Sequence, residues 1–264
     1  MVRKQLRHAK LHTICEEAKC PNIGECFNRG TATFLILGRI CSRNCRYCHV
    51  QHGIPEPLNA GEPDDVAESV RSLGLHYAVI TSVTRDDLLD GGAEHFAQTI
   101  QAIKKQNPHC KVEVLIPDFQ GNTDSLAMVL SAKPDVLNHN IEVVRELFPQ
   151  IRPQGDYQRS LSVLKKSKTL APGIPTKSGF MVGLGETKDQ IHCLLKDLQS
   201  AHVEYLTIGQ YLQPSKEHRC VSKYYTPEEF MELESQAYAL GFSHVVSGPL
   251  VRSSYHADEC IRDT

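Results

Sequence analysis

From residue 30 onward, short apolar runs alternate with longer segments in which apolar residues recur every three or four positions. The short runs predict β-strands, and the three- and four-residue spacing predicts amphipathic helices. The predicted strands are Thr33–Leu37, Tyr77–Val83, Lys111–Ile116, Val136–Asn140, Lys177–Val182, Tyr205–Gln210 and His244–Ser247. The predicted helices are Pro63–Leu73, Ala93–Gln106, Thr123–Ala132, Tyr157–Leu170, Lys188–His202 and Pro227–Leu240.

This alternation predicts an α/β fold with a parallel sheet and right-handed crossovers. Two arrangements are compatible with it, an open doubly wound sheet or a full or partial barrel. In both, the reactive residues lie at the carboxyl ends of the strands. We divide the chain into an N-terminal extension over residues 1–30, a strand–helix domain over residues 31–242 and a C-terminal extension over residues 243–264.

The composition is that of an ordinary globular protein. Of the 264 residues, 41% are hydrophobic and 23% are charged, which is enough apolar material for a sizeable core. The net charge of −2 does not indicate a nucleic-acid partner. The sequence has no run of about 18 apolar residues, so no membrane span is expected. No secretory signal is expected either, which predicts the cytoplasm, or an organelle matrix if a longer precursor exists.

Cysteine is the most informative residue type, because six of the ten cysteines lie between residues 15 and 48. Clustered thiols in a chain without a secretory signal indicate metal ligands or catalytic groups before disulfides. Of the other four, Cys110 and Cys193 are expected to be buried as small apolar side chains. No role is expected for Cys220 and Cys260.

A CxxxCxxC triad, Cys41, Cys45 and Cys48, falls in the loop after the first predicted strand. Soft thiolates select zinc or iron–sulfur clusters. On a four-iron cluster, three thiolates leave one iron without a protein ligand, and that iron can bind a substrate. The alternative is a zinc site, which usually has CxxC pairs and a fourth ligand; His49 or His52 would supply it.

A second group of cysteines has the spacing CxxxxCxxxxxC. It comprises Cys15, Cys20 and Cys26. Pro21, Asn22 and Gly24 are expected to break any helix here, so the three thiols are not expected to share a core-facing helix face. Beside the CxxxCxxC triad, this group indicates a second set of metal ligands.

Several of these features resemble known families. The CxxxCxxC spacing after the first strand, with the aromatic Tyr47 before its last cysteine, resembles the radical S-adenosylmethionine superfamily. Both triads together with the Arg252-Ser253-Ser254-Tyr255 motif resemble the lipoyl synthase family, over nearly the whole chain. The resemblance implies a partial (β/α)6 TIM-like barrel, and because water and oxygen must be excluded, we expect the N- and C-terminal extensions to close its mouth.

The lipoyl synthase resemblance implies a sulfurtransferase that inserts two sulfur atoms, at C6 and C8 of an octanoyl chain held on a lysine of a carrier domain. General acid–base catalysis cannot remove a hydrogen from a saturated carbon, whereas a radical can. The CxxxCxxC cluster would pass an electron to S-adenosylmethionine, and the resulting 5′-deoxyadenosyl radical would abstract the hydrogen. The resemblance names as catalytic residues Cys41, Cys45, Cys48 and Ser254.

The resemblance also implies a second 4Fe-4S cluster that donates its sulfur and is consumed. Its ligands would be Cys15, Cys20, Cys26 and Ser254. Spacing alone does not choose Ser254 over Ser253, and without the resemblance both serines would be assigned to a turn or a helix cap.

Candidate contacts to S-adenosylmethionine lie after the predicted strands. The segment Gly179–Glu186 resembles the GxIxGxxE pattern, with Met181 at the isoleucine position, and the resemblance places it beside adenine, where close backbone approach needs glycine. A tight strand-to-helix turn is the alternative. The segment Thr81–Asp87 stands where relatives carry a glycine-rich motif for the methionine amine; its carboxylates offer acceptors, and Arg85 suits a carboxylate.

For the two aspartates of that segment, Asp86 and Asp87, the alternative is a capped helix start. Asn138, Asn140 and Glu142 suit ribose or methionine contacts, and the latter two could instead be an N-cap pair for a short helix. The full set of candidate cofactor contacts is Tyr47, Thr81, Ser82, Arg85, Asp86, Asn138, Asn140, Glu142, Gly179, Gly183, Glu186 and Gln210.

The expected partners follow from the same resemblance. They are octanoylated lipoyl carrier domains (acyltransferase subunits of 2-oxoacid dehydrogenases and the glycine cleavage H protein), an electron donor such as ferredoxin or flavodoxin, and an iron–sulfur carrier that repairs the spent cluster. Two other classes remain open. A biotin-synthase-like enzyme would lack the CxxxxCxxxxxC triad and the serine motif, and a non-enzymatic iron–sulfur or zinc module would perform no radical chemistry.

Overall fold

The computed structural model describes residues 12–13 and 22–259. The chain forms two compact units. The first unit comprises residues 1–43 and 50–137, and the second unit comprises residues 44–49 and 138–264. The boundary passes through the CxxxCxxC loop, so that Cys41 belongs to the first unit whereas Cys45 and Cys48 belong to the second.

The first unit is built on parallel strands that pair in chain order, β2 (Thr31–Ile36), β3 (Tyr77–Ser82) and β4 (Lys111–Leu115). The two-residue strand β1 (His12–Thr13) pairs with β2 in the antiparallel sense. β5 (Val136–Asn138) begins in this unit, and its last residue, Asn138, is assigned to the second unit. Every residue of β2 is buried, which is typical of parallel strands that are covered on both faces.

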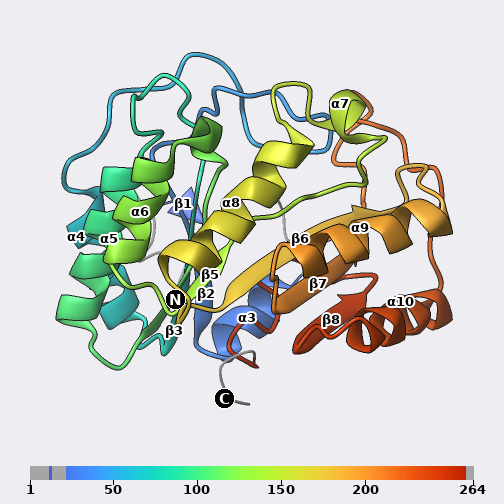
Figure 1. The fold of residues 1–264 in the computed structure, drawn as a ribbon. Coiled ribbons are helices and arrows are strands. Elements are labelled where there is room, and N and C mark those ends of the chain that lie inside the picture. The colour runs from blue at the N-terminus through green and yellow to red at the C-terminus, as the bar shows by residue number, and fades with distance from the viewer. Residues whose placement is uncertain (1–11, 14–21, 260–264) are drawn as a thin grey trace. The chain divides into compact units, whose positions relative to one another are not determined.

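The helices of the first unit cover its strands (Figure 1). They are α3 (Ile23–Asn28), α4 (Glu62–Ser72), α5 (Ala93–Gln106), the 3-10 turn η1 (Phe119–Gly121) and α6 (Thr123–Ser131). α5 packs against α4, α6 and β4. It buries Phe96, Ile100 and Ile103, whose spacing of three and four residues places them on one helix face.

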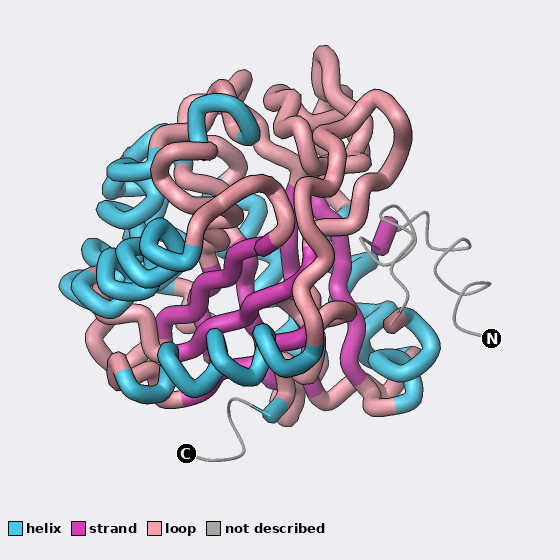
Figure 2. The backbone as a smooth tube through the Cα atoms, turned by 90° about the vertical axis from the view of Figure 1, so that its right-hand side faces the viewer, coloured by secondary structure: helices cyan, strands magenta, loops and turns pink. Residues whose placement is uncertain are grey.

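The second unit repeats the alternation of parallel strand and helix, as the tube view also shows (Figure 2). Its strands are β6 (Thr176–Val182), β7 (Tyr205–Gln210) and β8 (His244–Gly248). Its helices are α7 (Phe148–Ile151), α8 (Tyr157–Leu170), α9 (Lys188–Ser200) and α10 (Pro227–Ala239). α9 and α10 each begin with a capping box, in which Thr187 or Thr226 bonds the amide three residues ahead.

The predicted α/β fold and its elements are confirmed. All six predicted helices and all seven predicted strands occur, with ends that differ by two residues or fewer. β1, α3, η1 and α7 were not predicted, since elements of two to six residues are too short to show a periodic pattern. None of the helices within residues 22–259 combines the length and the hydropathy that crossing a membrane requires.

The expectation that no helix forms around Cys26 was wrong. α3 contains both Gly24 and Cys26, and the Cys26 amide donates a hydrogen bond to the Asn22 carbonyl over 3.0 Å. Pro21 precedes the helix in sequence, where a missing N–H removes no helical hydrogen bond. Gly24 lies in the first turn, and one glycine costs a helix only about 1 kcal/mol. Cys15 and Cys20 lie outside the described residues.

The other predicted cysteine positions are half right. Cys110 is buried, and burial raises the pKa of its thiol to about 11. Cys193 is exposed, contrary to prediction. α9 turns Ile191, Leu194 and Leu198 toward the core, and Cys193 lies outside that face.

Candidate active site

The Cys41 thiol lies in the loop after β2 and accepts two backbone hydrogen bonds. Their donors are the amide of Arg43, at 3.4 Å, and the amide of Thr84, at 3.3 Å. The Cys41 amide itself donates to the Gln51 carbonyl over 2.8 Å. Hydrogen bonds to ligand sulfurs orient them and tune the potential of a cluster, so this thiol has the surroundings of a metal ligand.

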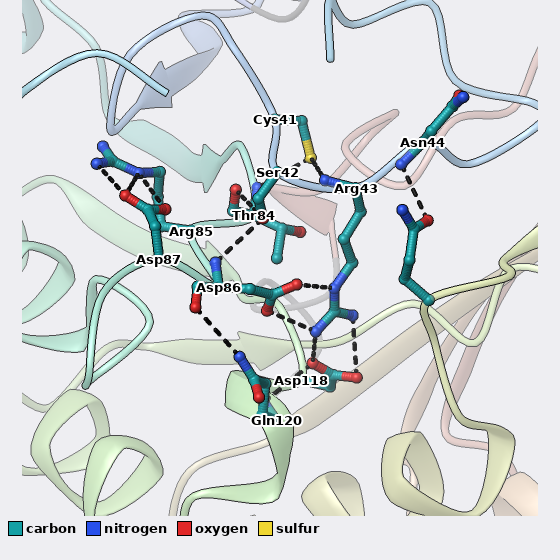
Figure 3. A network of polar contacts seen from close by, with 11 residues as sticks. Cys41, Ser42, Arg43, Asn44, Thr84, Arg85, Asp86, Asp87, Asp118 and Gln120 are labelled. Atoms are coloured by element: carbon teal, nitrogen blue, oxygen red, sulfur yellow. Dashed lines mark hydrogen bonds and ion pairs between the residues drawn. The ribbon is translucent and has the colours of Figure 1, made fainter. Parts of the chain in front are cut away.

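Ser42 joins the cysteine loop to the loop after β3. Its amide and its hydroxyl both donate to the Thr84 carbonyl, each over 3.0 Å, and its hydroxyl oxygen accepts the Asp86 amide at 3.1 Å. Figure 3 shows the resulting connection between the two segments. The first half of the cysteine loop is therefore held to the segment predicted to bind the methionine amine.

Arg43 connects the cysteine loop to the same segment, and to Asp118, through buried ion pairs. Its guanidinium donates to both carboxylate oxygens of Asp86, at 2.6 and 2.8 Å, and to both of Asp118, at 3.1 and 2.7 Å (Figure 3). Arg43 is 3% exposed and Asp118 is fully buried. Burial lowers the pKa of the Arg43 guanidinium, but the two carboxylates more than offset this, so the net shift is upward.

Asp86 and Asp87 do not cap a helix, so that alternative was wrong. α5 begins at Ala93 behind the N-cap residue Gly92, beyond both aspartates. Asp86 is bound by Arg43, and Asp87 is bound by Arg85 at 2.8 Å. The hydrogen bond from Arg85 lowers the pKa of Asp87. The carboxylate partner that was expected for Arg85 is therefore Asp87, two residues further along the same loop.

The second half of the cysteine loop, residues 44–49, is held by hydrogen bonds to neutral groups of the second unit. The Asn44 amide donates to the side-chain oxygen of Gln154 over 3.0 Å. The Arg46 amide donates to the Ile151 carbonyl over 2.9 Å. This half of the loop therefore rests on α7 and the residues that follow it.

A histidine holds the last cysteine of the motif. Nε2 of His218 lies 3.0 Å from the Cys48 carbonyl, and Nδ1 of the same ring lies 2.8 Å from the Ser215 hydroxyl. The Arg219 amide donates to the Arg46 carbonyl over 3.1 Å. The loop after β7 thus contacts main-chain carbonyls of the cysteine loop.

Tyr47 and Glu142 form a partly buried pair in the second unit. Burial raises the pKa of Tyr47 well above its usual value, and the nearby Glu142 and Cys45 act in the same direction. Burial also raises the pKa of Glu142, against the opposing effects of Arg152 and of hydrogen bonds from Asn140 and Tyr47.

The suggestion that Asn140 and Glu142 cap a helix was wrong, because α7 begins at Phe148 behind Leu147. Glu142 instead has a left-handed backbone, with φ 73°, and exchanges main-chain hydrogen bonds with β6.

The glycine segment after β6 is tightly packed. A Cβ on Gly179 would collide with the Thr207 hydroxyl, and one on Gly183 would collide with the Gln210 amide and the Lys223 carbonyl. Gly183 also has φ +102°, a conformation that side chains strongly disfavour. The Glu186 carboxylate accepts the Gly183 amide at 2.6 Å, so this segment forms the tight turn that was the alternative to an adenine contact, and the adenine contact stays a prediction.

Comparison with known proteins decides between the enzyme classes. The profile of the Radical SAM superfamily matches residues 35–198. The lipoyl synthase of Halalkalibacterium halodurans is 54% identical over 99% of this chain and 87% of its own length. That of Caldanaerobacter subterraneus subsp. tengcongensis is 57% identical over 96% of this chain and 89% of its own length. The chain belongs to the lipoyl synthase family. It is therefore a sulfurtransferase that uses S-adenosylmethionine and iron–sulfur clusters.

Solved structures show the same fold as this lipoyl synthase family member at low sequence identity. A methylornithine synthase superposes with a TM-score of 0.60 at 12% identity, over 97% of this chain and 86% of its own. The maturase HydG of [FeFe]-hydrogenase superposes with a TM-score of 0.55 at 15% identity, over 98% of this chain and 73% of its own. The predicted radical S-adenosylmethionine fold is thereby confirmed. The division into extensions and a central domain stays a prediction.

The residues present fit the cofactors of lipoyl synthases. Among the described residues, Cys41, Cys45 and Cys48 form no disulfide. Ser82 Oγ and Asn140 Oδ1, near the carboxyl ends of β3 and β5, are buried and have no hydrogen-bond partner within the described residues. An unsatisfied buried polar atom costs about 1–3 kcal/mol, and such atoms are expected where a ligand supplies the partner.

Other predicted contacts already have partners within the chain. The Thr81 hydroxyl donates to the Leu115 carbonyl over 3.2 Å. The Gln210 side chain donates to the carbonyls of Tyr211 and Lys223 and accepts the Tyr225 amide, each over 3.0 Å. Asn138 is fully buried in β5. Gln210 therefore shapes the loop after β7 rather than presenting a free amide.

The serine motif lies in the second unit. Ser253 and Ser254 are both half-buried in one turn, so their burial does not distinguish them. Val251, the residue before the motif, packs closely against β7, since a Cβ on Gly209 would collide with the Val251 carbonyl. Arg252 donates to that same carbonyl over 2.7 Å. Cys26, the described member of the first triad, belongs to the first unit.

Sequence reasoning missed four residues that hold the cysteine loop. They are Arg43, Asp118, Gln154 and His218. Arg43 could have been suspected from its place between two ligand cysteines. Asp118 lies 75 residues away and carries no signal that connects it with the loop.

Proposed function

We propose that this enzyme inserts sulfur at C6 and C8 of an octanoyl chain carried on a lysine of a lipoyl carrier domain. The observation that supports this most is the identity of 54% and 57% with lipoyl synthases over nearly the whole chain, which includes both cysteine triads. The carriers would be acyltransferase subunits of 2-oxoacid dehydrogenases and the glycine cleavage H protein. We place the enzyme in the cytoplasm, served by a ferredoxin or flavodoxin and an iron–sulfur carrier.

The ligand assignment is part of the proposal. Cys41, Cys45 and Cys48 would hold the cluster that works with S-adenosylmethionine; together these cofactors supply a radical able to take hydrogen from a saturated carbon. The second 4Fe-4S cluster is a substrate, because its sulfur ends in the product. Its proposed ligands are Cys15, Cys20, Cys26 and Ser254.

The chain's own residues would bind and orient the cofactor. Ser82 and Asn140 offer buried polar atoms to its polar groups. Gly179 leaves space that a side chain would fill, and Glu186 holds the turn of Gly183 in shape. The Glu142 carboxyl, whose pKa is raised by burial, would orient Tyr47 beside the last cysteine of the motif.

The experiment uses reduced, anaerobically reconstituted enzyme with S-adenosylmethionine and an octanoyl-lysyl peptide. We expect about eight irons per chain, if both clusters have four irons, a mass gain of two sulfurs on the peptide and release of 5′-deoxyadenosine. Cys41→Ala should abolish both products. Its matched control, Cys193→Ala, changes an exposed thiol and should retain both. Release of 5′-deoxyadenosine without sulfur transfer would contradict the proposal.

A further inference from the structure

Arg43 stands between two proposed cluster ligands in the sequence, and its side chain is used entirely for contacts with two carboxylates. It makes four hydrogen bonds, two to Asp86 and two to Asp118, all between 2.6 and 3.1 Å. One planar guanidinium reaching both oxygens of two carboxylates is a geometry that a lysine ammonium cannot reproduce.

The location of the two carboxylates gives this contact its meaning. Asp86 belongs to the loop after β3, where the Thr84 amide bonds the Cys41 sulfur; Ser82, whose hydroxyl is unpaired within the described residues, is the last residue of β3. Asp118 is the N-cap of η1, and its carboxylate also accepts the Gln120 amide at 3.1 Å. Arg43 thereby joins three segments of the first unit, which follow β2, β3 and β4.

Stability alone does not explain such a network. Replacing a buried ion pair by well-packed apolar residues is often neutral or stabilising, because desolvation of the charges offsets their attraction. What a buried, bidentate network does provide is one defined geometry. Here that geometry relates the Cys41 sulfur to the polar groups at the end of β3.

We propose that Arg43 is a positioning residue. Held by Asp86 and Asp118, it fixes the position of the Cys41 sulfur relative to the proposed S-adenosylmethionine contact at the end of β3. The inference rests on the proposed function. It adds that a change at Arg43 can disturb the placement of S-adenosylmethionine while the cluster is still bound. A small displacement between reacting groups can cost about a hundredfold in rate.

The test compares Arg43→Lys with wild type and with Arg145→Lys, which changes an exposed arginine that is paired with Asp197. Lysine keeps the positive charge but cannot make the four hydrogen bonds of the planar guanidinium. We expect Arg43→Lys to keep its thermal midpoint and its iron content. Its KM for S-adenosylmethionine should rise by about tenfold or more, as expected from lost positioning. The spectral change that S-adenosylmethionine causes in the electron paramagnetic resonance of the reduced cluster should be weakened. Arg145→Lys should match wild type.

Two results would overturn the inference. One is an unchanged KM and spectral response in Arg43→Lys. The other is a loss of activity that only parallels a loss of iron, with KM unchanged, since that is a purely structural effect. If Arg43→Lys fails to fold, the triple variant Arg43→Met with Asp86→Asn and Asp118→Asn, which removes all three charges, takes its place, with the same expectations for KM and for the spectral response. Wild-type enzyme that shows no spectral response to S-adenosylmethionine would contradict the proposed function itself.

Discussion

The two halves of the CxxxCxxC loop are held by different kinds of interaction. The half that contains Cys41 is bound through the buried charges of Arg43, Asp86 and Asp118. The half that contains Cys45 and Cys48 is bound mainly through single hydrogen bonds, which involve main-chain amides and carbonyls, His218, and Tyr47 with the Glu142 carboxyl. Neutral bonds are individually worth about 0.5–1.5 kcal/mol, whereas removing one partner of a buried ion pair costs about 3–5 kcal/mol. A single substitution should therefore damage the first half far more than the second.

The largest effect is expected for Arg43→Met, which leaves two carboxylates without their cation. We expect the free energy of unfolding in urea to fall by about 3–5 kcal/mol. Adding Asp86→Asn and Asp118→Asn should recover a large part of this loss, because no buried charge then remains. Arg145→Met, at an exposed pair, should cost at most about 1 kcal/mol. A loss in Arg43→Met no larger than in Arg145→Met would remove the distinction between the two halves.

An intermediate effect is expected for His218→Ala in the second half. The change removes one hydrogen bond to the Cys48 carbonyl and should cost about 1 kcal/mol in urea unfolding. The control His192→Ala alters an exposed histidine of α9 and should leave stability unchanged. A cost for His218→Ala as large as that of Arg43→Met would show that neutral contacts hold their half equally firmly.

A smaller effect is expected for Gln154→Ala. Its bond to the Asn44 amide is exposed, so water can take the place of the lost side chain. We expect a change in thermal midpoint close to that of the control Gln199→Ala, another exposed glutamine. A clearly larger shift would mean that this single contact anchors the second half of the loop.

The smallest effect concerns pH. Arg85 lowers the pKa of Asp87 in the folded protein, so this carboxylate stabilises the fold above its unfolded pKa and ceases to do so as the pH falls through its folded pKa. Asp87→Asn should thus be slightly less stable than wild type near neutral pH and equal to it in strong acid. Glu56→Gln, at a weakly paired surface site, should show no such pH dependence. A difference that persists at low pH would have another cause.

Much of the fold was predictable, because its information is local. The period of the apolar residues identified every long helix and strand within residues 22–259, and Thr226-Pro227 begins α10 as helix-start chemistry requires. The errors were also local in origin. Cys193 was predicted to be buried because it lies in a helix, but the face of that helix that packs against the core was not identified. α3 was excluded because Pro21, Asn22 and Gly24 were expected to prevent a helix, although the first two precede it and Gly24 lies in its first turn.

The cysteine spacing, read along the chain, by itself pointed to the class of cofactor and, with the serine motif, to the lipoyl synthase family. The tertiary structure alone decided what holds those cysteines. Arg43 meets Asp86 and Asp118 across 43 and 75 residues of sequence, and His218 meets Cys48 across 170. Ligand spacing is set by neighbouring residues and can be recognised in a linear pattern. Buried partners are brought together only when the strands pair, so no local pattern contains them.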